Sequence, residues 1–225
     1  MVVRYLGHSC FYVSTGKGST IIIDPYGDKL RYKFPTITAD VVLVTHEHFD
    51  HNATWRIGGS PWIVKRTSDF AMEHELVVKR TGETLTFFGV PTHHDKFSGR
   101  RRGPNTIFHW FCEGVHFCHL GDLGHLLTEQ QVQILGKVDV LFLPVGGNIT
   151  LEPTEAALVM NQLNPNIVFP MHYLTPHIDG LDLAKEPLDS FLSRMDNVEH
   201  AATMAVDVDL PRLPQRTRIT ILNYE

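Results

Sequence analysis

The sequence predicts an α/β protein in which β-sheets are covered by outer helices. Short apolar runs typical of strands recur along the 225 residues, and the helix signals are fewer but clearly marked. Strand–helix–strand units alternate with antiparallel hairpins, the order expected of sheets with helices packed outside them. Two runs, Val41–Thr45 and Val138–Leu143, are almost wholly apolar, as expected of strands covered on both faces.

The strands are predicted from apolar runs bounded by turn residues. Glu113-Gly114 lies between two aromatic-rich runs and predicts a two-residue hairpin that places Cys112 beside Val115 and Cys118 beside His109. The predicted strands are Val2–Leu6, Phe11–Val13, Thr20–Ile23, Val41–Thr45, Trp62–Val64, Thr84–Phe88, Thr106–Phe111, Val115–His119, Val138–Leu143, Ile167–Phe169 and Thr217–Leu222.

Two helices have clear end signals. Thr128 and Gln131 form a capping box that opens one helix, which is expected to end by Gly136. Pro153 opens a second helix, which Asn164-Pro165 ends. Weaker helical patterns lie at Ser68–Leu76 and Pro187–Arg194.

The composition is that of an ordinary globular protein without an electrostatic bias toward nucleic acid. Apolar residues make up 43% of the chain, charged residues 20%, and the formal net charge is −5. No apolar run reaches the roughly 18 residues that a membrane span needs, and no signal-peptide pattern opens the chain. We therefore expect one cytoplasmic domain over residues 1–225, with no membrane association and with nucleic acid not favoured as a partner.

The cysteines indicate a reducing compartment. Cys10, Cys112 and Cys118 are an odd number and contain no CxxC pair, which argues against a disulfide framework. We expect three buried free thiols and no chemistry at cysteine.

The chemistry is expected at histidine, of which the chain has 14. The run Val41–Thr45 is followed by His46-Glu-His-Phe-Asp-His51, which brings three imidazoles and a carboxylate to the end of a buried strand. His46 and His48 alternate and can face the same side, whereas Asp50 and His51 follow one turn later. Imidazole and carboxylate are ligands of zinc, and divalent iron and manganese accept them as well. Burying these groups without an ion would cost several kcal/mol.

Further candidate ligands also follow predicted strands. His93-His94-Asp95, Asp122 and His172 each come directly after an apolar run, so they can meet at one rim of a sheet. Together with the first cluster they supply the ligand types of two adjacent ions, which a lone aspartate can bridge.

The motif HxHxDH, followed by a further His, a Gly-Asp and a late His, resembles the metallo-β-lactamase superfamily. The resemblance extends over nearly the whole chain. Within the superfamily, the sequence is similar to the small metal-dependent hydrolase branch related to ascorbate-6-phosphate lactonase. This resemblance implies a four-layer αββα sandwich, classed as α/β or, in some schemes, α+β. The matching motifs are Gly7–Phe11, Ile23–Tyr26, Thr92–Asp95, Arg102-Gly103, His119–His125, Pro144–Gly147 and Pro170–Tyr173.

The resemblance also implies a role for each candidate ligand. The first of two divalent ions would be held by His46, His48 and His94, where His94 is preferred to His93 because it aligns with the histidine of the branch motif. The second would be held by Asp50, His51 and His172, with Asp122 as the bridge. Asp50 is also expected to orient the attacking water, and Glu47 is a spacer.

Three residues are candidates for supporting or substrate-binding roles. His8 and His125 lie in family-like motifs, where they would steady a ligand or contact substrate, with plain structural hydrogen bonding as the alternative. The run Arg100–Arg102, Arg102 in particular, would bind an anionic substrate group, with a solvated charged surface as the alternative.

The predicted function is that of a metal-dependent hydrolase acting on a small ester, lactone or phosphodiester. Two divalent ions, zinc first and manganese or iron as alternatives, would activate a water for attack. A nuclease is one alternative, disfavoured by the net charge and by the lack of room for a nucleic-acid domain. A non-hydrolytic metal or redox protein is another, and β-lactam hydrolysis would be a poor role in the cytoplasm.

Overall fold

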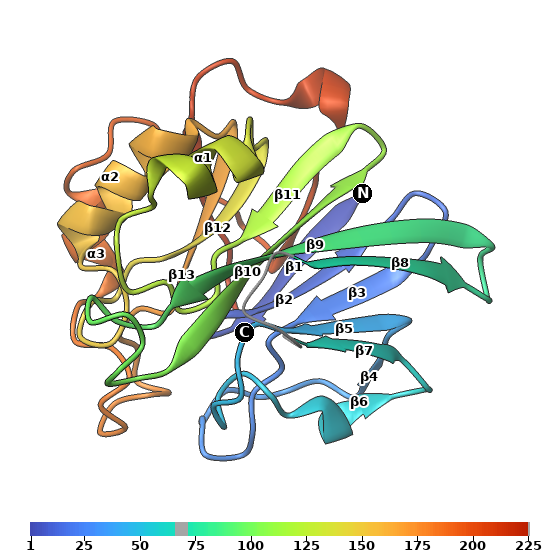
Figure 1. Ribbon diagram of the computed structural model, residues 1–225, viewed down its shortest axis with the longest axis horizontal. Helices are drawn as coiled ribbons and strands as arrows, with labels where there is room; N and C mark the ends of the chain where they lie inside the picture. The colour runs from blue at the N-terminus through green and yellow to red at the C-terminus, as the bar shows by residue number, and fades with distance from the viewer. Residues whose placement is uncertain (66–71, 225) are drawn as a thin grey trace.

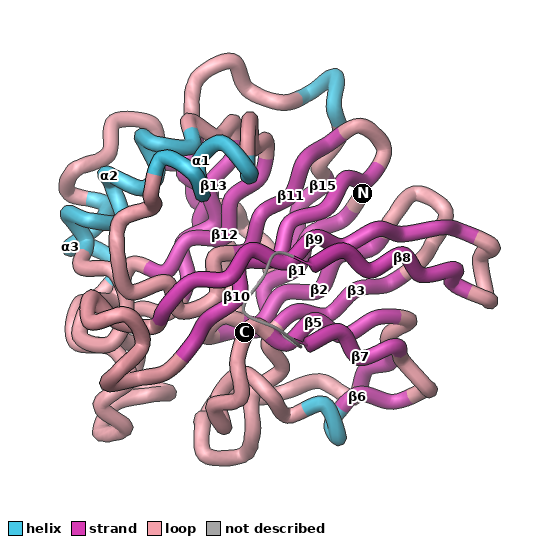
Figure 2. The backbone as a smooth tube through the Cα atoms, in the orientation of Figure 1, coloured by secondary structure: helices cyan, strands magenta, loops and turns pink. Residues whose placement is uncertain are grey.

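Two β-sheets pack face to face at the centre of the computed structural model, which describes residues 1–65 and 72–224 (Figures 1 and 2). The first sheet has six strands, in the order β15 (Ala205–Asp207), β1 (Val2–Gly7), β2 (Cys10–Ser14), β3 (Thr20–Ile23), β5 (Val41–Val44) and β7 (Trp62–Lys65). The second has eight, in the order β14 (Val198–His200), β16 (Arg218–Ile221), β13 (Ile167–Met171), β12 (Val140–Pro144), β11 (Val115–His119), β10 (Pro104–Cys112), β9 (Glu83–His93) and β8 (Met72–Val78). A separate pair joins β4 (Ile37–Thr38) to β6 (Ile57–Gly58).

The helices lie on the outer side of the second sheet. Figure 1 shows α1 (Glu129–Leu135), α2 (Pro153–Leu163) and α3 (Leu188–Leu192) gathered beside β12 and β13. Both predicted end signals are present, because Thr128 and Gln131 form the capping box of α1 and Asn164 ends α2 in the left-handed conformation. The weak pattern at Pro187–Arg194 corresponds to α3.

The central strands β3 and β5 of the first sheet are buried on both faces, which explains their continuous apolar sequences. In β3, Ile21 and Ile23 join the core between the sheets, whereas Ile22 joins a second apolar cluster on the outer face. That outer face is covered by segments 24–36 and 174–184 and not by α-helices of the described part of the chain. Tyr26 and Ile178 supply apolar cover there.

Every predicted strand is present, with boundaries shifted by up to five residues. Glu113 and Gly114 both have positive φ, and the hairpin pairs Cys112 with Val115 and Cys118 with His109, as the turn predicted. All three cysteines are buried and free.

The helix predicted at Ser68–Leu76 is wrong from Met72 onward. Residues 72–76 belong to β8, which pairs antiparallel with β9 over seven residue pairs, and residues 68–71 lie outside the described part of the chain. Alternation of half-buried and exposed side chains along β8 shows the two-residue period of a strand. The short strands β4, β6, β14 and β15 were not predicted either.

No helix of the described residues combines the length and the apolar character required to cross a bilayer.

Candidate metal centre

The central loop of the site follows the carboxyl end of β5 in the first sheet. Because β3 and β5 are parallel neighbours, Asp24 after β3 lies beside Thr45 after β5. The Asp24 carboxylate accepts hydrogen bonds from the Thr45 amide (2.8 Å) and the Thr45 hydroxyl (2.7 Å). These bonds hold the start of the segment that carries His46 to His51.

The other candidate ligands come from the facing sheet. β9, β11 and β13 run in the same direction, so their carboxyl ends meet at one edge. His94, Asp122 and His172 follow these three strands and reach the loop after β5 across the sandwich. The tertiary structure thus brings together all seven predicted ligands.

Asp122 lies at the centre of the cluster. Its Oδ2 atom is 3.0 Å from His94 Nε2, 3.1 Å from His172 Nε2, 3.2 Å from His51 Nε2 and 3.8 Å from His46 Nε2. Burial alone would raise the pKa of Asp122, but the surrounding imidazoles outweigh that effect and hold it well below its ordinary value. Asp122 is therefore an ionised carboxylate surrounded by imidazole nitrogens.

The potential ligand atoms fall into two main groups. His46, His48 and His94 form one, with ligand atoms within 4.8 Å of one another. Asp50, His51 and His172 form the other together with His8, within the same limit. Asp122 belongs to a further group with His46, a member of the first group, and His51, a member of the second. Asp122 therefore lies between the two main groups of potential ligand atoms.

Hydrogen bonds to the outer ring nitrogens fix the direction of these histidines. His94 Nδ1 donates to the Ile149 carbonyl (2.8 Å), so Nε2 carries a free lone pair. His51 Nδ1 donates to Asp24 Oδ2 (2.9 Å). His46 Nδ1 donates to the Thr45 hydroxyl (2.9 Å), which itself donates to Asp24. Each Nε2 atom therefore faces the centre in the form that binds a cation.

The side-chain atoms that face the centre of the cluster are buried and lack hydrogen bonds, as expected of atoms that bind a metal ion. The contacts to Asp122 do not have hydrogen-bond geometry, and each buried, unpaired polar atom costs about 1–3 kcal/mol. The unpartnered atoms are Nε2 of His46, His51, His94 and His172 and both carboxylate oxygens of Asp122. Imidazole nitrogens and carboxylate oxygens suit divalent zinc, iron or manganese, so the residues present fit metal ions.

Two glycines allow the loops around the centre to pack closely. A Cβ on Gly121, whose φ is +56°, would lie 2.3 Å from Asn105 Oδ1. A Cβ on Gly146 would lie 2.1 Å from the His172 carbonyl oxygen. Glycine is required at Gly121 because its backbone lies against the buried Asn105 and Thr45 side chains, and at Gly146 because it lies against the backbone of His172.

Two supporting residues were not among the predicted site residues. Asp24 links ligands of both groups, through Thr45 to His46 and directly to His51. Asn105 accepts from the Asp122 amide (3.0 Å) and donates to the Leu120 carbonyl (2.9 Å), which fixes the loop after β11. A carboxylate directly after the apolar run Thr20–Ile23 was a signal that could have identified Asp24.

His8 lies within the cluster. It is buried, its Nε2 donates to Asp50 Oδ2 (3.0 Å), and its ring centroid is 4.2 Å from that of His172. Its carbonyl accepts from the His172 amide (2.9 Å). His8 thus contacts two candidate ligands of the second group.

His125 and Arg102 lie farther out. His125 Nε2 accepts from the His93 amide (3.2 Å), and in the described part of the chain His125 forms no hydrogen bond or ion pair with the side chain of a predicted ligand. Arg102 is exposed and lines a cavity that His94 also lines. His93 is exposed at the end of β9, whereas His94 is buried in the cluster.

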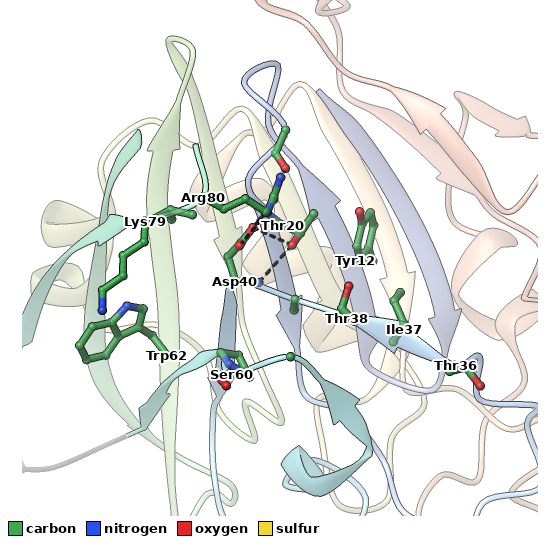
Figure 3. Close-up of a pocket in the computed structure, with 15 residues that line it drawn as sticks. Tyr12, Thr20, Thr36, Ile37, Thr38, Asp40, Ser60, Trp62, Lys79 and Arg80 are labelled. Atoms are coloured by element: carbon green, nitrogen blue, oxygen red, sulfur yellow. Dashed lines mark hydrogen bonds and ion pairs between the residues drawn. The ribbon is translucent and has the colours of Figure 1, made fainter. Parts of the chain in front are cut away.

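A second, larger groove lies at the other end of the first sheet. Figure 3 shows it between Trp62 of β7, Lys79 and the segment around Thr38. Asp40, the central carboxylate, already accepts from the Thr20 amide (2.8 Å) and pairs with Arg80. Because its charge is satisfied and no histidine of the described residues lines the groove, this end of the sheet does not have the chemistry of the cluster around Asp122.

Comparison with known proteins identifies relatives over most of the chain. Residues 2–172 match the family model described as a β-lactamase superfamily domain. A UPF0173 metal-dependent hydrolase of Thermococcus onnurineus is 30% identical over 197 residues, which cover 77% of this chain and 84% of that protein. One from Pyrobaculum arsenaticum is 28% identical over 227 aligned positions, which cover 89% of this chain and 94% of that protein.

A solved structure has the same fold. A Thermotoga maritima protein, described as a Zn-dependent hydrolase of the metallo-β-lactamase superfamily, is 31% identical to this chain. It superposes with a TM-score of 0.75, covering 98% of this chain and 97% of that one. This likeness confirms the predicted α/β fold class of the metallo-β-lactamase type. The helical layer expected outside the first sheet is replaced, in the described residues, by segments 24–36 and 174–184.

Proposed function

The chain belongs to the metallo-β-lactamase superfamily and is similar to its metal-dependent hydrolases, and from this premise we propose that it cleaves an ester, lactone or phosphodiester bond in a small molecule. One observation carries the proposal. Four buried Nε2 atoms and both oxygens of Asp122 face one another without hydrogen bonds. Groups arranged in this way hold cations, and the two ligand groups on either side of Asp122 support two of them.

Two bound divalent ions would supply Lewis acidity, lowering the pKa of a water toward neutrality and polarising the oxygen of the bond that is cleaved. The protein groups position the reaction. Asp50 accepts from His8 and lies 3.5 Å from His51, so its carboxylate is held at the edge of the second group, where it would orient the water. The rigid loops after β9, β11 and β13 keep the imidazoles in place.

The proposal includes zinc as the bound ion and the cytoplasm as the cellular compartment. The set of imidazoles with a shared carboxylate favours zinc, and manganese or iron remain alternatives because they accept the same ligands. Three buried free thiols fit a reducing compartment, which supports a cytoplasmic location.

Metal content gives the first test. Protein purified without added metal and then saturated with zinc should contain about two equivalents by elemental analysis, in line with a two-metal site. Less than half an equivalent would contradict the site as a whole. One equivalent would contradict the two-ion arrangement alone.

Substrate class gives the second test. Lactones, phosphodiesters and single-stranded RNA would be assayed with wild type, Asp50→Ala and Glu47→Ala. Glu47 is the matched control, because it lies in the same loop but is exposed and pairs with Lys65. Asp50→Ala should lower kcat about 10²-fold or more, while Glu47→Ala leaves it unchanged. Turnover of RNA alone would favour a nuclease, and full activity of Asp50→Ala would contradict the proposed mechanism.

A further inference from the structure

A cavity of about 360 Å³ lies directly beside the metal centre. His94 forms part of its wall, so the cavity adjoins the first ligand group. Ile149, whose carbonyl holds His94 Nδ1, and Thr150 line it as well. His94 is the one predicted ligand among its lining residues in the described chain, so the cavity lies next to the first ligand group.

The loop that follows His94 is held rigidly by one carboxylate. Asp95 Oδ1 accepts from the amides of Phe97 (2.7 Å) and Gly99 (3.0 Å), and Oδ2 accepts from those of Arg101 (2.9 Å) and Arg102 (2.8 Å). The carboxylate is thus bound to the backbone and does not pair with the guanidinium groups.

The loop brings two cations without carboxylate partners to the cavity. Arg101 and Arg102 both line it, and in the part of the chain that the structure describes neither side chain forms an ion pair. The Arg101 guanidinium stacks over the Phe97 ring at 3.8 Å, which restricts its motion. Lys96, which also lines the cavity, is already paired with Glu155 (2.6 Å).

The remaining acidic group at the cavity has another role. Glu152 accepts from the Asn148 amide (3.3 Å) and caps the start of α2. In a protein of net charge −5, two unpaired arginines next to a candidate metal ligand form a local positive site. Guanidinium groups bind carboxylates and phosphates through paired hydrogen bonds.

We propose that Arg101 and Arg102 bind an anionic group of the substrate, a carboxylate or a phosphate, while the bond to be cleaved lies at the ions beside His94. This inference rests on the proposed function and narrows its substrate class to small anionic esters or lactones. The site uses only two of the three arginines in the predicted run Arg100–Arg102. Arg100 does not line the cavity, and its Nε donates to the Phe97 carbonyl (3.0 Å).

The test compares two esters that differ in charge. Mono-4-nitrophenyl succinate carries a carboxylate, and 4-nitrophenyl butyrate has the same number of acyl carbons without it. Zinc-loaded wild type, the double variant Arg101→Gln/Arg102→Gln and the control Arg100→Gln would be assayed with both. The double variant should lower kcat/KM for the succinate ester about 10-fold or more and change that for the butyrate ester less than about 2-fold. The control should match wild type.

Binding measured without turnover separates this inference from the proposed function. Calorimetry with succinate and with inorganic phosphate would show which anion the metal-loaded protein binds. The double variant should bind the preferred anion about 10-fold more weakly than wild type and Arg100→Gln. Absence of ester hydrolysis with arginine-dependent binding would contradict only the proposed function. Equal binding by all three proteins, or equal loss of activity on both esters, would overturn the arginine site.

Discussion

His8 Nε2 lies 3.0 Å from Asp50 Oδ2, and this contact joins the turn between β1 and β2 to the histidine-rich loop after β5. Both side chains are buried, and His8 has a φ of +55°. A non-glycine residue in this region is uncommon, so its backbone is held there by surrounding contacts such as the amide of His172. His8 therefore has the geometry of a residue that positions a candidate ligand.

Replacing His8 should disturb the second ligand group. His8→Asn tolerates the positive φ but is too short to hold Asp50, so we expect kcat to fall about 10–100-fold with little change in KM. His8→Gln has a longer amide and should restore part of the activity. The visible spectrum of the cobalt-substituted protein should change in His8→Asn and recover in His8→Gln. An unchanged spectrum in both variants would show that His8 has only a structural role.

Asp24 is expected to control the affinity for both ions, because its carboxylate holds His51 directly and His46 through Thr45. Asp24→Asn should weaken metal binding about 10–100-fold, as measured by competition with a chelator. The matched control is Asp40→Asn, because Asp40 is likewise hydrogen-bonded to a neighbouring threonine but lies in the distant groove of Figure 3. Equal metal affinity in the two variants would contradict the role of Asp24.

His172 should matter for the second ion more than for the first. It belongs to the group with Asp50 and His51, and its φ of +53° makes asparagine the replacement that preserves the backbone. Zinc titration of His172→Asn should show one tight and one weakened site. His48→Asn, in the other group, should weaken the opposite site. Equal weakening of both sites by His172→Asn would contradict the division of ligands.

The pair His109–His116 should make the protein sensitive to acid. His109 Nδ1 donates to His116 Nε2 (3.0 Å), and burial followed by the neighbouring imidazole lowers the pKa of His109 to about 4. The unfolded chain, with an ordinary histidine pKa near 6.5, takes up the proton first as the pH falls. The stability is therefore full above about pH 6.5 and is lost progressively toward pH 4.

This pH dependence can be measured apart from metal binding by comparing variants. Urea unfolding of wild type and His109→Gln at pH 7 and pH 4.5 gives the difference due to one imidazole. Wild type should lose about 2 kcal/mol more than His109→Gln over this range. An equal loss in both proteins would show that His109 does not take up a proton in this range.

The sequence contains no motif at His109 or His116, and the pairing of β10 with β11 brings these two residues together.

Local features of the fold were predictable from the sequence by itself. Strand periodicity, the capping box at Thr128 and the turn at Glu113-Gly114 depend on a few adjacent residues, and the structure contains all of them. The histidine motif after β5 is local in the same sense. The helix predicted at Ser68–Leu76 was wrong over residues 72–76 because pairing with β9 outweighed a weak helical pattern. The strands β14 and β15, of three residues each, exist only through their partners.

The relations between distant segments were decided by the tertiary structure. The parallel alignment of β3 with β5 places Asp24 against Thr45, and the common direction of β9, β11 and β13 brings their following loops to one edge. Within the loop after His94, Arg100 bonds to the Phe97 carbonyl and does not line the cavity, whereas Arg101 and Arg102 do. Such contacts depend on strand order and register, which arise when the two sheets pack and bury their shared core. A motif can therefore predict which residues are candidate metal ligands, whereas the packed sheets determine what holds those side chains in place.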